Sequence, residues 1–125
     1  ITLIEEVKKY QDIFSKYLEI MNNEEKKTKI YEQSKGLLTL IDSFKILMKQ
    51  FEETGEETFL KEATELYIDN IIKTANNICK LKYATNKVEF NSKDNTYKLL
   101  QKSYKEEELL ILIPGSENKI IKYQL

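Results

Sequence analysis

The sequence predicts a mainly α fold: an antiparallel three-helix bundle followed by a small C-terminal β-hairpin element. Apolar residues recur at steps of three and four through three segments of the first 86 residues, which is the period of one helix face. A short turn at Thr54-Gly55 separates the second and third segments. Beyond residue 86 apolar and charged residues alternate, which is typical of strands.

The first helix is predicted from about residue 3 to residue 21. Its apolar positions alternate between steps of four and three, so they share one face with a near-heptad spacing. These positions are Leu3, Val7, Tyr10, Phe14, Tyr17 and Met21. Asn22, with Glu25 three places later, has the pattern of a helix cap and predicts that the second helix begins here.

The second helix is predicted to continue to about Glu53. One apolar stripe runs along it, consisting of Ile30, Leu37, Ile41, Phe44, Met48 and Phe51. Leu40 and Leu47 widen this stripe beyond a two-stranded seam. A wide apolar face indicates packing against two neighbours at once, so we expect this helix to be the central one.

The third helix is predicted to follow the Thr54-Gly55 turn, and its first residues Glu56 and Glu57 suit the positive end of a helix dipole. The short turn makes the second and third helices antiparallel. Its apolar stripe consists of Leu60, Ala63, Tyr67, Ile71, Ala75 and Ile78, with Phe59, Leu66, Ile72 and Cys79 beside it. Lysines gather at its end, as the helix dipole favours.

The region from residue 87 to residue 125 is predicted to be rich in β structure. Val88 and Phe90 alternate with charged residues, residues 92–95 resemble a turn, and Tyr97 and Leu99 alternate again. This pattern predicts a hairpin. A fourth helix capped by Asp94 or Asn95 is the alternative for residues 92–108, because several apolar residues there also fit a helical face.

A second hairpin is predicted at the C-terminus. Leu109 to Ile113 form a continuous apolar run, residues 114–118 are dense in turn-forming types, and apolar residues follow up to Tyr123. We interpret residues 1–125 as one domain, with the bundle over about 2–86 and the β-rich element over about 87–125. Because the chain begins with Ile1, we expect it to be a domain excised from a longer protein.

The composition argues against familiar chemistry. The chain contains no histidine, arginine or tryptophan, so it lacks the side chain that titrates near neutral pH, the imidazole metal ligand and the bidentate anion fork. Its glutamate runs lack the spacing of a calcium loop. We therefore expect no enzyme activity and no catalytic, metal or cofactor site.

The location of the protein is predicted from its cysteine and its hydropathy. The single Cys79 has no partner for a disulfide within the chain, which favours a reducing, intracellular (cytoplasmic) compartment. No apolar run approaches the roughly 18 residues of a membrane span, so a soluble chain is predicted. The formal net charge of −1 selects no partner.

The functional prediction is a non-catalytic protein-protein interaction or scaffold module of a larger intracellular protein. An apolar strand beside a turn either packs on the bundle or offers an edge to another chain. The C-terminal hairpin is therefore the predicted contact for another protein or for a second copy of this chain. Its predicted partner-binding residues are Leu110, Leu112, Ile120 and Tyr123.

The alternative function is binding of single-stranded nucleic acid or an anionic membrane. Between residues 73 and 105 the chain carries eight lysines and only two acidic residues, Glu89 and Asp94, with aromatic residues interleaved. Such a composition suits phosphate contacts and base stacking. The predicted anionic-ligand residues are Lys73, Lys80, Lys82 and Lys87.

Overall fold

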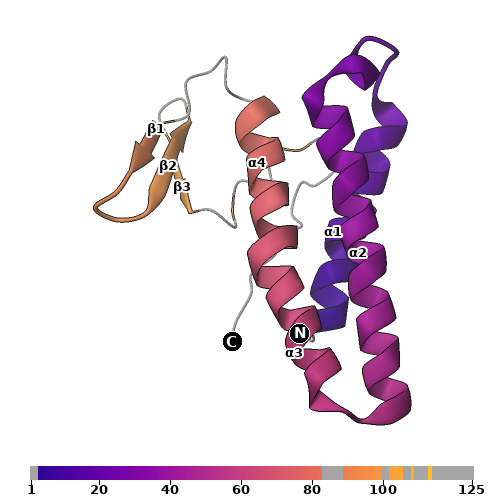
Figure 1. The fold of residues 1–125 in the computed structure, drawn as a ribbon. Helices are drawn as coiled ribbons and strands as arrows, with labels where there is room; N and C mark the ends of the chain where they lie inside the picture. The colour runs from indigo at the N-terminus through magenta and orange to yellow at the C-terminus, as the bar shows by residue number, and fades with distance from the viewer. Residues whose placement is uncertain (1–2, 83–88, 100–101, 106–107, 109–112, 114–125) are drawn as a thin grey trace.

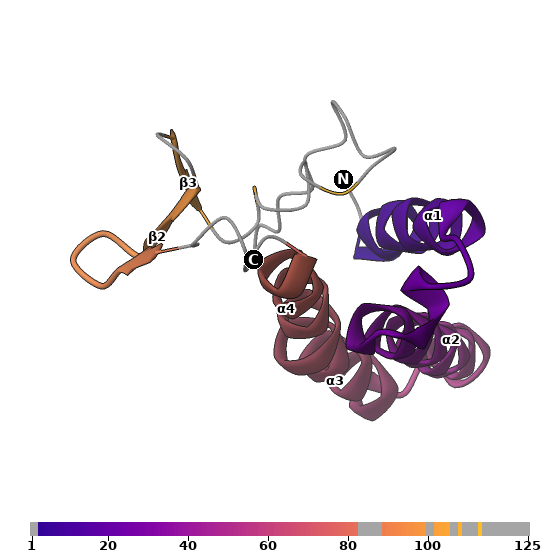
Figure 2. The same ribbon diagram turned by 90° about the horizontal axis from the view of Figure 1, so that it is seen from above.

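The structure is a computed structural model that describes residues 3–82, 89–99, 102–105, 108 and 113. Three long helical segments pack side by side, and a small antiparallel sheet stands next to the last of them (Figures 1 and 2). The segments are α1 (Leu3–Ile20), α2 (Lys29–Thr54) and a third segment made of α3 (Glu57–Leu66), the π-helix η2 (Tyr67–Ile71) and α4 (Ile72–Lys82). The chain reverses direction twice, which confirms the antiparallel three-helix bundle.

The start of α2 corrects one prediction. The Glu25 backbone N–H donates to Oδ1 of Asn22 at 2.8 Å, but this cap begins only a short 3-10 helix, η1 (Glu25–Lys27). Thr28 then takes an extended backbone conformation, with ψ 162°, and interrupts the helical path. Consequently α2 begins at Lys29 rather than just after Asn22.

The helix α2 ends at Thr54, close to the predicted end at Glu53. Gly55 adopts a left-handed conformation, with φ 70°, and its N–H donates to the Phe51 carbonyl at 2.7 Å. A side chain at this φ would be strained, which explains why glycine stands here. The tight turn places α3 antiparallel against α2, and the two helices are in direct contact.

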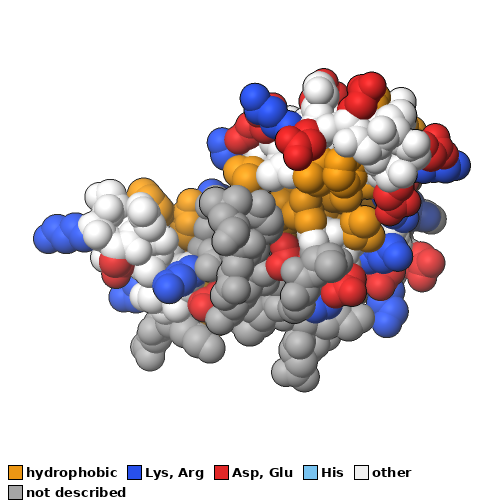
Figure 3. All heavy atoms as spheres, turned by 90° about the horizontal axis from the view of Figure 1, so that it is seen from below, with side chains coloured by type: hydrophobic (Ala, Val, Ile, Leu, Met, Phe, Trp, Pro, Cys, Tyr) orange, Lys and Arg blue, Asp and Glu red, His pale blue; other side chains and the backbone are white. Residues whose placement is uncertain are grey.

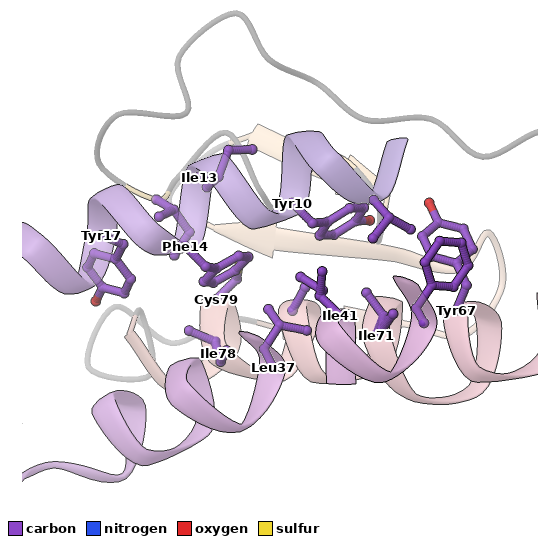
Figure 4. Packing of buried hydrophobic residues seen from close by; sticks show 14 of the residues in the cluster. Tyr10, Ile13, Phe14, Tyr17, Leu37, Ile41, Tyr67, Ile71, Ile78 and Cys79 are labelled. Atoms are coloured by element: carbon purple, nitrogen blue, oxygen red, sulfur yellow. The ribbon is translucent and has the colours of Figure 1, made fainter. Parts of the chain in front are cut away.

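The core lies where the three predicted stripes meet. Figure 4 shows Tyr10, Phe14 and Tyr17 of α1 directed toward side chains of α2 and of the third segment. The buried apolar side chains are Val7, Tyr10, Ile13, Phe14, Tyr17, Met21, Leu37, Ile41, Phe44, Ala63, Tyr67, Ile71, Ala75, Ile78, Cys79, Leu99 and Ile113. None of the described helices has both the length and the apolar character of a membrane span.

The π-helix η2 keeps one face of the third segment on the core. Ala63, Tyr67, Ile71 and Ala75 are separated by three successive steps of four, and all four are buried. In a straight α-helix twelve residues rotate a stripe by about 120° away from its start. The wider turn, in which the Ile72 N–H donates to the Tyr67 carbonyl five residues back, absorbs this rotation.

The sheet has three antiparallel strands in the order β1-β2-β3. The strands are β1 (Glu89–Asn91), β2 (Thr96–Leu99) and β3 (Lys102–Lys105). The predicted hairpin is thus confirmed, and the alternative of a helix over residues 92–108 is wrong. Asp94 Oδ1 accepts from the N–H and hydroxyl of Thr96, and Asn95 takes φ 55°, so both residues build the turn instead of capping a helix.

Candidate functional site

The predicted contact at the C-terminus falls on a part of the chain that the structure does not describe. Leu110, Leu112, Ile120 and Tyr123 all lie outside the described residues. Ile113, the last residue of the same apolar run, is described and is fully buried in the bundle core. The end of the run therefore contributes to the core.

The structure does not gather the predicted anion-binding lysines into one patch. Lys82 donates to the Tyr17 hydroxyl at 3.2 Å, and its Nζ lies 4.6 Å from the centroid of that ring. Lys73 and Lys80 instead share a shallow hollow on α4 with Thr74 and Asn77. Lys87 lies outside the described residues.

Lys80 connects α4 to the sheet. Its Nζ donates to the Tyr97 hydroxyl at 2.9 Å and lies 4.3 Å from the Tyr97 ring centroid. The Tyr97 ring in turn contacts the Phe90 ring, with centroids 5.0 Å apart. A continuous row of contacts thus runs from the lysine side of α4 to Phe90 on the outer strand β1, where Phe90 is 54% exposed.

A second hollow lies on the sheet. Its lining is mostly polar and consists of Glu89, Phe90, Asn91, Ser92, Lys93, Thr96, Lys98 and Ser103. Lys93 and Lys98 are both exposed. Lys98 shares its face of the sheet with its direct partners Glu89 on β1 and Ser103 on β3, whereas Phe90 is paired with Tyr97 and its ring lies on the opposite face.

A separate apolar surface lies where α2 turns into α3. We define the α2–α3 end surface as Met48, Phe51, Phe59 and Leu60, all of which are half-buried. The Phe44 ring on α2 and the Tyr67 ring on η2 are in tilted contact, with centroids 6.4 Å apart. The four residues of the surface lie one to two helical turns nearer the Gly55 turn, beyond this last aromatic contact of the core.

Carboxylates border the α2–α3 end surface. Glu52, Glu53, Glu56 and Glu57 are all exposed around the turn. Leu60 also lines an open hollow on α3 whose charged residues are Glu57, Glu65 and Lys61. Figure 3 shows hydrophobic side chains gathered on this lower face, with acidic and basic side chains around them. The arrangement is a small apolar area with four carboxylates around the turn and the exposed lysines Lys49 and Lys61 farther along α2 and α3.

A buried carboxyl group, that of Glu6 on α1, contacts the same Tyr67 that packs against Phe44. The Tyr67 hydroxyl donates to Oε2 of Glu6 at 3.2 Å, and the Tyr10 ring packs edge-on against Tyr67 with centroids 6.0 Å apart. Burial raises the pKa of Glu6, while the Tyr67 hydrogen bond and the Lys9 charge lower it by less. Burial also raises the pKa of the Tyr67 hydroxyl.

Glu6 was missed by the sequence analysis, although the sequence carries a signal for it. Glu6 precedes the fully buried Ile13 by one heptad, so the two residues share a face of α1. Neither belongs to the six-residue stripe that predicted the helix. Treating them as part of a wider apolar face would have identified a carboxyl group directed into the bundle.

Cys79 is a buried core thiol. It is 1% exposed, and burial raises its pKa to about 12, so at neutral pH it is protonated and a poor nucleophile. Among the described residues no three histidine, cysteine, aspartate or glutamate side chains come together as a metal site.

Comparison with known proteins gives no match: no family model fits the chain, and no curated protein or solved structure is significantly similar to it.

Proposed function

We propose that this chain is a non-catalytic protein-interaction module and that the α2–α3 end surface binds its partner. The observation that carries the proposal is that Phe51, Phe59 and Leu60 lie half-exposed outside the core cluster, with Met48 at its edge and carboxylates around the turn. Its buried, unreactive thiol also suits a reducing intracellular compartment. The absence of histidine and arginine supports a role without catalysis.

The chemistry of the surface indicates the kind of partner. An apolar centre with a charged rim is the usual organisation of a protein interface. Here the rim residues around the turn, Glu52, Glu53, Glu56 and Glu57, are all acidic. The best complement is an amphipathic helix that presents leucine-like side chains flanked by lysine or arginine, which docks by its apolar stripe and is steered by charge.

A binding experiment with two synthetic helical peptides tests the proposal. One peptide carries a leucine stripe flanked by lysines, and the other carries the same stripe flanked by glutamates. We expect the basic peptide to shift the NMR amide signals of residues 48–66 and to bind at least tenfold more tightly than the acidic one. Added salt should weaken the binding, because the charges on the rim are exposed.

Substitutions separate this surface from other exposed apolar residues. Phe59→Lys should weaken binding of the basic peptide about tenfold or more, which corresponds to about 1.4 kcal/mol. Ile46→Lys is the matched control, because Ile46 lies on α2 away from the surface and is 59% exposed. Equal losses for both variants, or signal shifts outside residues 48–66, would contradict the assignment.

A further inference from the structure

One outer edge of the three-stranded sheet is open among the described residues. The strand order is β1-β2-β3, and β1 pairs only with β2 within the part of the chain that the structure describes. Its three residues, Glu89, Phe90 and Asn91, are all exposed. An edge strand directs part of its backbone N–H and C=O groups away from its neighbour, so β1 can accept one more strand.

The other outer strand, β3, is less open. The backbone N–H of Lys105 donates to Oε2 of Glu108 at 3.4 Å, and Tyr104 packs against the bundle core. The strand also begins and ends with a lysine, and lysine on an edge strand opposes pairing with another strand. For these reasons β1 is the better edge for strand addition.

An aromatic row leads to the open edge. Phe90, Tyr97 and Tyr104 are direct partners across β1, β2 and β3, so their side chains share one face of the sheet. The Phe90 and Tyr97 rings are in contact, with centroids 5.0 Å apart, and Lys80 holds Tyr97 with a 2.9 Å hydrogen bond. The row stops at Phe90, which is 54% exposed, and no described strand lies beyond β1.

We propose that β1 pairs in antiparallel orientation with β1 of a second copy of the chain, with the two Phe90 residues directly opposite each other on a two-fold axis. The two three-stranded sheets then form one six-stranded sheet. The axis is perpendicular to the sheet, so both aromatic rows lie on the same face and join through the Phe90 pair. This interface is separate from the α2–α3 end surface and does not depend on the function proposed for it.

The register of the pair follows from the side chains of β1. With Phe90 on the axis, Glu89 of each copy lies opposite Asn91 of the other. Centring the pair on Glu89 would place two carboxylates directly opposite each other, which is destabilising. Centring it on Asn91 would place Phe90 opposite Ser92, which belongs to the turn. Of these three registers, only the one centred on Phe90 avoids repulsion and places the ring against another ring.

The opposite face of β1 is complementary to itself, which favours a second copy over a foreign strand. Glu89 has Lys98 as its partner on β2. Oδ1 of Asn91 accepts from the Lys93 N–H at 3.0 Å, so the side-chain nitrogen of Asn91 is the part left to donate. In the symmetric pair this nitrogen lies next to the Glu89 carboxylate of the second copy. Each copy thus supplies both the donor and the acceptor, as a two-fold interface requires.

Sedimentation equilibrium of the full chain tests the proposal. Because the shared edge is three residues long, we expect a weak dimer with a Kd on the order of 100 μM, as suits an interface smaller than the standard size. Phe90→Lys places two ammonium groups opposite each other and should raise this Kd about tenfold or more. Ile46→Lys is the matched control, because Ile46 is similarly exposed, at 59%, and lies on α2; it should leave the Kd unchanged.

NMR of the wild type tests the same contact without any substitution. In an equal mixture of isotope-labelled and unlabelled chain at about 1 mM, roughly tenfold above the expected Kd, we expect isotope-filtered NOEs between the Phe90 rings of the two copies. NOEs between Glu89 of one copy and Asn91 of the other should accompany them. Unchanged helix amide signals and thermal melts in the Phe90→Lys variant would show that its bundle is intact.

Three results would overturn the proposal. The first is a chain that stays monomeric at about 1 mM. The second is a dimer that the folded Phe90→Lys variant forms as tightly as the wild type, or one whose intermolecular NOEs lie on the helices instead of β1. The third is an extended peptide of alternating threonine and valine that shifts the β1 amide signals while the chain itself stays monomeric, which would assign the edge to a foreign strand.

Discussion

The contribution of Glu6 to the stability of the core depends on pH, because its buried carboxyl group can ionise. Its side chain is only 5% exposed, and the Tyr67 hydroxyl is the partner that satisfies one of its oxygens. Burial raises its pKa in the folded state above the value in the unfolded chain. Folding therefore favours the protonated form, and the ionised form carries a desolvation cost at neutral pH.

The sign of this effect predicts how a neutral substitute behaves. The contribution of Glu6 to the free energy of unfolding is fully present below its unfolded pKa and is lost as pH rises through the raised native pKa. Glu6→Gln keeps an acceptor for Tyr67 and removes the charge. We expect the variant to be more stable than the wild type at pH 7 and to lose this advantage near pH 4, measured by urea denaturation.

Tyr67→Phe provides the opposite test at the same contact. It removes the hydroxyl that donates to Glu6 and leaves the ring in place. We expect a loss of about 1–3 kcal/mol at pH 7, because a buried carboxylate is left without its donor. A loss smaller than about 0.5 kcal/mol would indicate that water replaces the hydroxyl.

The helices were predictable because their signals are local. Each stripe of apolar residues sets one face, and Gly55 fixes one reversal of the chain through its own backbone conformation. The start of α2 was placed too early because Asn22 does cap a helix, but a short one. The short helix η1 ends because the backbone of Thr28 is extended. A cap pattern predicts where a helix begins and not where it ends.

The sheet shows where the spacing of apolar residues fails to distinguish a helix from a strand. Tyr97, Leu100 and Tyr104 fit a helical face, while Tyr97 and Leu99 fit a strand. The decision comes from pairing: β2 is held between β1 and β3, and Tyr97 packs on the core. The strand pairs join residues only three to nine positions apart, but the packing of Tyr97 on the core joins residues that are distant in the sequence, so a local pattern cannot weigh it.

Lys80 gives the sheet its described link to α4, which predicts the effect of removing it. Lys80→Ala should destabilise β2 and β3 relative to the bundle by about 1 kcal/mol, from the lost contact with the Tyr97 ring. We expect their amides to exchange about fivefold faster in hydrogen-exchange measurements. Lys73→Ala, one heptad earlier and exposed, is the control and should leave these rates unchanged.

Over the whole molecule, acidic and basic side chains gather in separate regions, which the small net charge does not reveal. Carboxylates surround the α2–α3 turn, while lysines cover α4 and the sheet, although the formal net charge is only −1. The sequence located both groups. What it could not show is that Phe90 lies beside one group and Phe59 beside the other, because these placements depend on how the sheet and the helices pack.

The π-helix η2 means that the fold contains one residue more than an uninterrupted α-helix would need. The buried residues Ala63, Tyr67, Ile71, Ala75 and Ile78 are separated by steps of four, four, four and three, and removal of the exposed Asn70 would change these steps to four, three, four and three. That is the ordinary α-helical spacing, so the same side chains would still face the core.

The bundle should therefore tolerate a shorter chain at this one place. We expect the Asn70 deletion to stay folded, with a melting temperature within about 5 °C of the wild type, or within about 1 kcal/mol. Deletion of Asp42, an equally exposed residue in the regular helix α2, should unfold the protein, because it rotates half of that stripe by about 100°. Circular dichroism melts of both variants make the comparison. If length is adjustable at η2 alone, this segment is where related chains would gain or lose a residue without changing their fold.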